Sequence, residues 1–93
     1  MPQVTVALPS LLAGFVGGAR TLPLEADTLA GVLDELVRQH PALKVHLFDE
    51  SGGFRPHVLC FHNDESTRWL GSLDRPLAAG DAITIMQAVS GGA

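Results

Sequence analysis

The last four residues of this chain, Ser90, Gly91, Gly92 and Ala93, have the types and spacing that suit chemistry on a terminal carboxyl group. They directly follow an apolar, β-prone run over residues 82–89. Glycine adds backbone freedom and no side chain, so two glycines anchor a strand poorly but let the chain thread a narrow channel. Such a tail lets a partner enzyme reach a C-terminal carboxyl group and activate it. We therefore expect a domain over residues 1–89 and a flexible tail over residues 90–93.

The reach of this tail follows from backbone geometry. At about 3.3–3.6 Å per extended residue, the four residues from Val89 to Gly92 extend about 13–14 Å beyond the last strand. This length suffices to enter an enclosed nucleotide site, and we predict that residues from about Val89 onward are poorly ordered in the free protein. Ala93 follows the two glycines and would have to be removed before the Gly92 carboxyl group becomes terminal.

Cys60 is a second candidate for chemistry, as a sulfur-carrying nucleophile. It lies inside the apolar run Val58-Leu59-Cys60-Phe61, where a free cysteine behaves as a small buried hydrophobic residue and is inert. We therefore expect a structural role. With no second cysteine and no H-x-x-E-H spacing, the histidines predict no metal site. The histidines are His40, His46, His57 and His62.

Three further features have simpler interpretations than a site. The carboxylate pairs Asp49-Glu50 and Asp64-Glu65 fall in loops, where adjacent acids are usually solvated. Gly52-Gly53 is followed by no Lys-Ser/Thr and lacks the strand-to-helix context of a phosphate-binding loop. Trp69, the single tryptophan, either closes the core or anchors a partner, and we expect partial burial.

Length and composition limit the function further. The chain has 93 residues, of which 46% are apolar and 17% charged, as in a single globular domain. One cysteine permits no intrachain disulfide and suits a reducing compartment. The net charge of −4, with no basic cluster, argues against nucleic acid. No apolar stretch approaches the roughly 20 residues that span a bilayer, and the N-terminus has no signal-peptide pattern. We expect a cytoplasmic protein with no membrane partner.

The N-terminal quarter of the sequence predicts a β-hairpin. Val4, Val6 and Leu8 alternate with residues of the opposite face, which indicates a half-buried strand. A glycine-rich turn region over residues 11–18 follows, and then a second strand over residues 19–25. Pro23 places part of this second strand at a sheet edge.

The middle of the sequence predicts one main helix. Asp27-Thr28 supplies its N-cap, and His40-Pro41 ends it. Its apolar residues form one stripe that we assign to the core. They are Leu29, Val32, Leu33, Leu36 and Val37. A short helical turn over residues 42–48 and a loop over residues 49–53 follow.

The C-terminal part predicts three strands. Residues 57–62 form a compact apolar run, which indicates a strand covered on both faces. A short strand is expected at Trp69-Leu70. Gly80-Asp81 makes a tight turn into the final strand, where Ile83 and Ile85 face inward. This element order predicts an α+β domain with one main helix on one face of a mixed sheet, the order of the β-grasp fold.

The chain resembles the ubiquitin-like sulfur carrier family, which includes the small subunit of molybdopterin synthase and the thiamin sulfur carrier. The resemblance covers about the C-terminal 40% with good specificity; the N-terminal half matches mainly in element order. Within the family, the Asn63-Asp64-Glu65…Arg68…Gly71 stretch looks closest to the carriers of actinobacterial cysteine biosynthesis. The other matching segments are Arg55-Pro56-His57-Val58, Gly71-Ser72-Leu73, Leu77-Ala78-Ala79-Gly80-Asp81, Ile83-Thr84-Ile85 and Ala88-Val89-Ser90-Gly91-Gly92.

This resemblance implies a protein co-substrate and no enzyme. In the family, an E1-like activating enzyme uses ATP to adenylate the terminal carboxylate, and a sulfur donor displaces AMP to leave a thiocarboxylate. The site residue would be Gly92, at the end of the Gly91-Gly92 tail, and the carrier itself would bind no cofactor. The partner that takes up the sulfur would be a synthase. We favour a PLP-dependent cysteine synthase over enzymes of molybdopterin, thiamin or another thio-metabolite.

Ala93 departs from the family pattern, because family members typically end on the second glycine. In some relatives a zinc-dependent JAMM-type protease removes extra residues, and we expect the same of Ala93. The other interpretations are an engineered terminus and a homologue that never receives sulfur. Two further classes of function stay open: a non-conjugating β-grasp module that binds a partner through its sheet, and a ubiquitin-like modifier joined to lysines.

Overall fold

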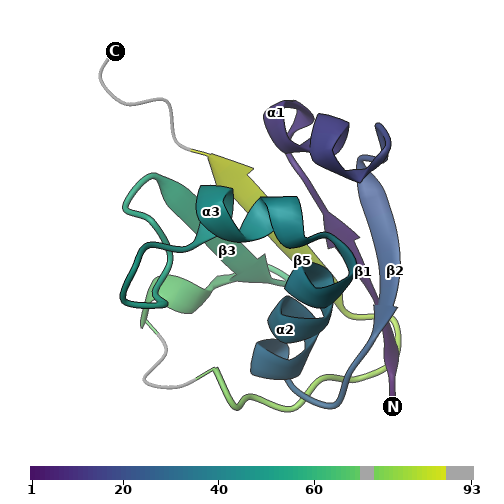
Figure 1. Cartoon of the computed structure of the whole chain (residues 1–93). Coiled ribbons are helices and arrows are strands. Elements are labelled where there is room, and N and C mark those ends of the chain that lie inside the picture. Colours follow the sequence, from purple (N-terminus) through teal and green to yellow (C-terminus); the bar gives the residue numbers. More distant parts are fainter. Residues whose placement is uncertain (70–72, 88–93) are drawn as a thin grey trace.

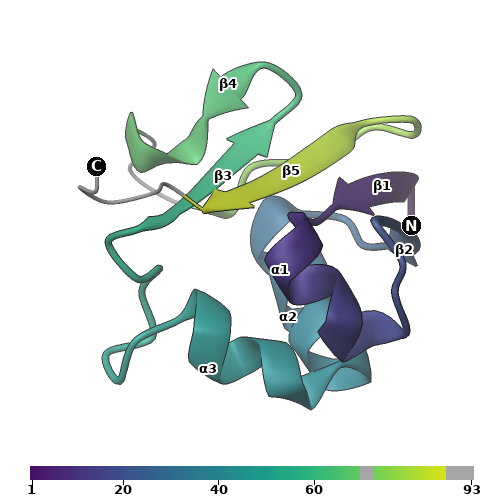
Figure 2. The same ribbon diagram turned by 90° about the horizontal axis from the view of Figure 1, so that it is seen from above.

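One mixed β-sheet runs through the molecule, and the α-helices pack on one of its faces (Figures 1 and 2). This computed structural model describes residues 1–69 and 73–87. The strand order is β2-β1-β5-β3-β4, with β1 and β5 parallel and the other neighbouring pairs antiparallel. The predicted α+β class with a mixed sheet is confirmed. The strands are β1 (Gln3–Ala7), β2 (Thr21–Glu25), β3 (Val58–His62), β4 (Glu65–Ser66) and β5 (Ala82–Gln87).

The predicted N-terminal hairpin is confirmed, but its connection is helical and not a simple glycine turn. Val4 and Val6 of β1 are buried, and Pro23 lies in β2 at the edge of the sheet. Between the strands the chain forms α1 (Ser10–Ala13) and the 3-10 helix η1 (Gly14–Val16). Leu12 and Val16, four residues apart, both point into the core, so this connection covers one end of it.

The predicted main helix is α2 (Leu29–Gln39). The Thr28 hydroxyl oxygen accepts a hydrogen bond from the Gly31 backbone N–H at 3.0 Å, as an N-cap does. The apolar stripe is buried except for Val37, which is half-buried. The chain then forms the 3-10 helix η2 (Pro41–Leu43) and α3 (Lys44–Leu47), which confirms the predicted helical turn.

Two predictions about the C-terminal half are wrong. In β3 only alternate residues, Val58, Cys60 and His62, are buried, because the helices cover one face; Leu59 and Phe61 are half-buried on the other. The short strand is β4, and Trp69 belongs instead to the 3-10 helix η3 (Thr67–Trp69). The burial predicted for the Trp69 side chain, and the residue Leu70, lie outside what the structure describes.

β5 lies between β1 and β3, and its Ile83 and Ile85 are buried as predicted. Gln87 is the last described residue. The tail predicted over residues 90–93, and the predicted disorder from Val89, lie beyond it and remain predictions. In the described part of the chain, no helix is long and apolar enough to cross a bilayer.

Candidate functional site

The described residue nearest to the Gly-Gly tail is Gln87, at the end of β5. Gln87 lies opposite Val58, and Ile85 lies opposite Cys60 of the antiparallel neighbour β3. On the other side, the parallel strand β1 pairs with β5 from Ala82 to Thr84. The strand that leads into Gly91-Gly92 is therefore paired on both sides as far as Thr84, and its last residues pair with β3.

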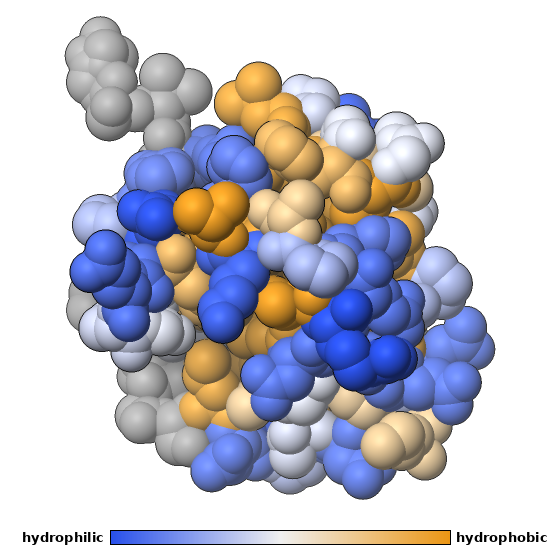
Figure 3. All heavy atoms as spheres, in the orientation of Figure 1, coloured by the Kyte–Doolittle hydropathy of each residue, from blue (hydrophilic) through white to orange (hydrophobic). Residues whose placement is uncertain are grey.

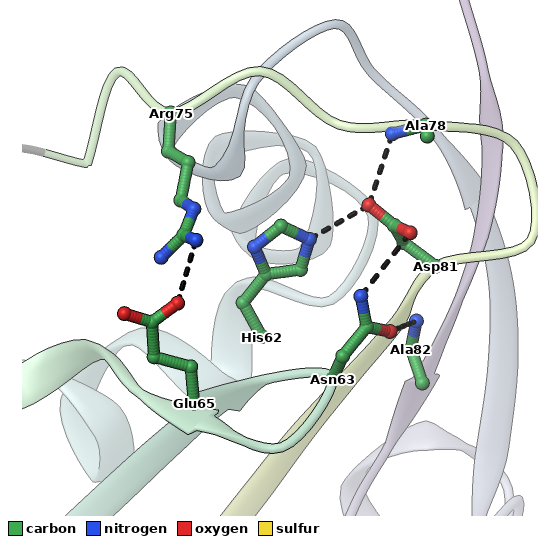
Figure 4. A network of polar contacts seen from close by, with 7 residues as sticks. All are labelled: His62, Asn63, Glu65, Arg75, Ala78, Asp81 and Ala82. Atoms are coloured by element: carbon green, nitrogen blue, oxygen red, sulfur yellow. Dashed lines mark hydrogen bonds and ion pairs between the residues drawn. The ribbon is translucent and has the colours of Figure 1, made fainter.

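The start of β5 is fixed by a polar network that centres on Asp81 (Figure 4). The Asp81 carboxylate accepts hydrogen bonds from the backbone N–H of Ala78 at 2.9 Å, from His62 Nε2 at 2.7 Å and from Asn63 Nδ2 at 3.2 Å. These donors, with Ala78 contributing most, lower the pKa of Asp81 to about 2. Asp81 is therefore ionised at neutral pH, and His62 Nε2 carries the hydrogen that it donates.

Asn63 and Glu65 extend this network beyond Asp81. Asn63 has a φ of 55°, a left-handed conformation that asparagine tolerates. Its backbone N–H donates to the Ala82 carbonyl oxygen at 2.7 Å, and its side-chain oxygen accepts from the Ala82 N–H at 2.9 Å. Glu65 forms an ion pair with Arg75, which lowers the pKa of Glu65. The network joins the end of β3 to the segment before β5, so it positions β5.

This network was missed by sequence reasoning. His62 and Asp81 are 19 positions apart and meet only because His62 pairs with Ile83 in the sheet. The sequence does contain one relevant signal, which is two polar segments next to apolar runs. Asn63-Asp64-Glu65 follows one apolar run, and Gly80-Asp81 precedes another. Their position at strand ends indicates proximity only when the strand pairing is known.

Cys60 is buried, as predicted, with 3% of its surface exposed. Burial raises the pKa of its thiol to about 11, although a hydrogen bond with Thr67 acts in the opposite direction. The thiol is therefore protonated at neutral pH, and it is a poor nucleophile. The structure supports the structural interpretation of this residue.

The histidines are dispersed over the fold. His40 caps the end of α2, His46 lies in α3, His57 precedes β3 and His62 joins the Asp81 network. Within residues 1–69 and 73–87, no group of three His, Cys, Asp or Glu side chains is close enough to hold a metal ion. The predicted site residues Gly91, Gly92 and Ala93 lie outside the described part.

The face of the sheet opposite the helices carries apolar residues next to the end of β5. Met86 is 48% exposed and lies opposite the half-buried Leu59, while Phe61 lies opposite Thr84. An exposed apolar surface of this kind suits contact with another protein.

Comparison with known proteins identifies relatives over almost the whole chain. Residues 9–92 match the model of the ThiS family. The sulfur carrier protein CysO of Mycobacterium tuberculosis strain H37Rv is 35% identical over 92 residues, which cover 97% of this chain and 99% of CysO. A crystal structure of M. tuberculosis CysO superimposes with a TM-score of 0.82 over 92% of this chain and 99% of that chain, at 34% identity.

Two further relatives come from other organisms. Small archaeal modifier protein 1 of Haloferax volcanii is 35% identical over 80 residues, which cover 83% of this chain and 87% of that protein. A crystal structure of the BexX/CysO complex of Amycolatopsis orientalis matches with a TM-score of 0.83 and 30% identity, over 96% of this chain and 99% of that chain. These neighbours share the β-grasp-like architecture.

Proposed function

We infer the function of this chain from its family, because the chain belongs to the ThiS family of small ubiquitin-like sulfur carriers. Members of this family are co-substrates and not catalysts. We propose that the Gly92 carboxylate, once Ala93 has been removed, is adenylated and converted to a thiocarboxylate that donates its sulfur in biosynthesis.

The proposed adenylation makes the terminal carboxylate reactive. A carboxylate is a poor electrophile, because its negative charge repels nucleophiles. An E1-like enzyme would transfer AMP from ATP to Gly92 and release pyrophosphate, which makes the carboxyl carbon reactive. A sulfur donor would then attack this carbon and displace AMP, leaving sulfur in place of one oxygen. The carrier would contribute a reachable terminus and a surface for docking.

The observation that carries the proposal is the position of Gly91-Gly92 after the central strand of the sheet. Gln87, the last described residue, ends β5 and pairs with Val58 of β3, and the five residues from Ala88 to Gly92 follow it in the sequence. The family match ends at residue 92, so it includes both glycines and leaves Ala93 outside. We propose that a JAMM-type zinc protease removes Ala93.

For the sulfur acceptor we favour cysteine biosynthesis, with a PLP-dependent cysteine synthase as the partner. The 35% identity to CysO over nearly the whole length supports this choice. We place the reaction in the cytoplasm, where an unpaired cysteine such as Cys60 stays reduced. Molybdopterin, thiamin and another thio-metabolite are the competing destinations.

The test compares adenylation of the full chain with that of a chain that ends at Gly92. We expect ATP-dependent pyrophosphate exchange by the E1-like enzyme only with the shorter chain. Ala93 displaces the carboxylate by over 3 Å, and a misplacement of about 1 Å can cost on the order of 100-fold in rate. Replacing Gly92 by alanine in the shorter chain should impair the exchange. Equal rates for the full and shortened chains would contradict the processing step.

Mass spectrometry of the protein from its native cells tests the function itself. A carrier should lose one alanine residue and then exchange one oxygen for sulfur. An unchanged mass in a stable complex would instead indicate a non-conjugating binding module. The acceptor is then identified by supplying the thiocarboxylate form to a PLP-dependent cysteine synthase and measuring cysteine.

A second function is favoured by one comparison. The 35% identity to small archaeal modifier protein 1 supports a role as a protein modifier, since the same activated terminus can be transferred to a lysine. Lysine adducts of this chain on other proteins, lost when Gly92 is deleted, would establish that function.

A further inference from the structure

A cavity of about 200 Å³ lies at the edge of β3 that faces away from β5. Three segments line it, namely residues 54–56, 58–60 and 66–68. In the described sheet, β4 pairs only with Phe61 and His62, so the first residues of β3 have no strand beside them on this edge. The volume is far above the about 10–15 Å³ that a single water needs, so the cavity has room for a small ligand.

Positive charge collects at this cavity. Two of the six basic residues, Arg55 and Arg68, line it, although the chain has a net charge of −4. Arg55 donates from Nε to the Val45 carbonyl oxygen at 2.7 Å, which orients its guanidinium group and leaves the two terminal nitrogens outside that bond. Within residues 1–69 and 73–87, the Arg68 side chain has no hydrogen bond or ion pair. In Figure 3, hydrophilic side chains gather at the left of the molecule, over the segment between α3 and β3.

The carboxylates that could neutralise this charge are engaged elsewhere. Among the described residues, no acidic side chain lines the cavity. Asp49 responds to the charge of Arg55, but the Ser51 hydroxyl lowers the pKa of Asp49 more, and Ser51 Oγ donates to Asp49 Oδ1 at 2.6 Å. Glu65 forms its ion pair with Arg75. Two guanidinium groups therefore border one cavity without a carboxylate between them, and their mutual repulsion favours an anion there.

Ser66 adds a neutral donor to the same cavity. Its Oγ accepts a hydrogen bond from the Arg68 backbone N–H at 3.3 Å, so the hydroxyl hydrogen stays available to a ligand. Thr67 differs, because its side chain is 7% exposed and its hydroxyl is bonded to the Cys60 thiol. The side chains that remain available are all donors. A ligand that fits them carries negative charge and several acceptor oxygens.

We propose that this cavity binds a small tetrahedral oxoanion, such as inorganic phosphate or sulfate, between the guanidinium groups of Arg55 and Arg68. A guanidinium group presents paired N–H donors whose spacing matches two oxygens of such an anion. Ser66 donates to a further oxygen. The bound anion joins the segment before β3 to η3, and it closes the edge of β3 that β4 leaves unpaired. The inference concerns the folded domain and is independent of the proposed chemistry at Gly92.

The experiment titrates the full chain with sodium phosphate at pH 7 and follows backbone amide signals by NMR. Sodium chloride keeps the ionic strength constant, so general screening does not change during the titration. We expect saturable shifts at the amides of Val58, Ser66, Thr67 and Arg68, which line the cavity. Shifts that rise linearly without saturation, or that spread evenly over the chain, would show that phosphate has no site here.

Arg68→Gln is the main variant, because Arg55 also holds the Val45 carbonyl oxygen and its replacement could disturb the fold. Loss of charged hydrogen bonds should weaken phosphate binding at least tenfold. Arg68→Lys keeps the charge and loses the paired donors, so its affinity should fall between that of the parent and that of Arg68→Gln. Unchanged affinity in Arg68→Gln would overturn the proposed site.

Arg38→Gln is the matched control, since it removes one positive charge at an exposed position. Arg38 lies in α2, pairs with Glu35 and does not line the cavity. We expect its affinity for phosphate to stay within about twofold of the parent value. Equal weakening by Arg38→Gln and Arg68→Gln would mean that phosphate responds to net charge alone, and the site would be wrong.

Sulfate tests the chemical class of the ligand. It has the same four oxygens around one centre, so we expect it to shift the same amides and to displace phosphate. If sulfate leaves the phosphate-bound signals unchanged at saturating concentration, the cavity does not recognise a tetrahedral oxoanion, and the proposal fails.

Discussion

The Asp81 carboxylate gives the molecule a defined response to acid. Its pKa is about 2 in the folded protein, against an ordinary value of 3.8, because Ala78, His62 and Asn63 donate hydrogen bonds to the ionised form. A carboxyl group whose pKa is depressed by folding stabilises the folded state above its unfolded pKa. That contribution is lost as the pH falls from about 3.8 towards 2. We expect the free energy of unfolding to decrease in this window.

The Asp81→Asn variant isolates this contribution, since Glu35, Asp49 and Glu65 also have lowered pKa values. We expect the variant to be less stable than the parent at pH 7, with a difference that narrows between pH 4 and pH 2. Urea unfolding of both proteins at several pH values between 2 and 7 measures this difference in the free energy of unfolding. A difference that stays constant with pH would show that ionisation of Asp81 does not stabilise the fold.

Cys60 is expected to affect stability without affecting sulfur transfer. Replacing it with alanine or valine changes a buried contact near β5 and should cost about 1 kcal/mol. Thermal unfolding measures this cost, and mass spectrometry measures thiocarboxylate formation on Gly92. If Cys60→Ala folds stably and yet forms no thiocarboxylate, the thiol takes part in the chemistry.

At the scale of residues, the sequence predicted local environments and missed distant partners. The burial of Cys60 follows from its apolar neighbours, which any reader of the sequence can see. The hydrogen bond between His62 and Asp81 cannot be predicted from neighbouring residues, because it depends on the pairing of β3 with β5. Pairing of strands far apart in the chain leaves no local pattern.

The packing of the helix α2 against the sheet can be tested with a single core substitution. Leu33 lies in the middle of its buried stripe and is packed in the main core cluster. Replacing it with alanine should leave a cavity and cost roughly 2–5 kcal/mol in denaturant unfolding. Asp34→Ala, on the exposed side of the same helix, should change stability by less than about 0.5 kcal/mol. Equal effects of the two substitutions would mean that α2 does not cover the sheet as described.

At the scale of elements, long periodic segments were predictable and short ones were not. β1 and α2 repeat their apolar residues often enough to reveal a period of two or 3.6. β4 has two residues and therefore has no period, so its position was predicted wrongly at Trp69-Leu70. The helical connection of α1 and η1 was hidden by its glycines, although Leu12 and Val16 have helical spacing.

The buried apolar residues within 1–69 and 73–87 form one hydrophobic core, so we expect the molecule to unfold in a single cooperative transition. Hydrogen exchange should nevertheless differ among the strands. The amides of β5, between β1 and β3, should be the most protected, and those of the two-residue edge strand β4 among the least. Native-state hydrogen exchange by NMR measures this order. Comparable protection of β4 and β5 would contradict the central role of β5.

The location of β5 also determines how the molecule bears mechanical load. Tension applied at Gln87 acts along the axis of the strand between β1 and β3 and loads the hydrogen bonds to both neighbours in shear. Bonds loaded in this direction must break together, because the strand has to slide past both neighbours at once. A motor that pulls on β5 from its C-terminal end therefore has to break the hydrogen bonds to β1 and to β3 in one step.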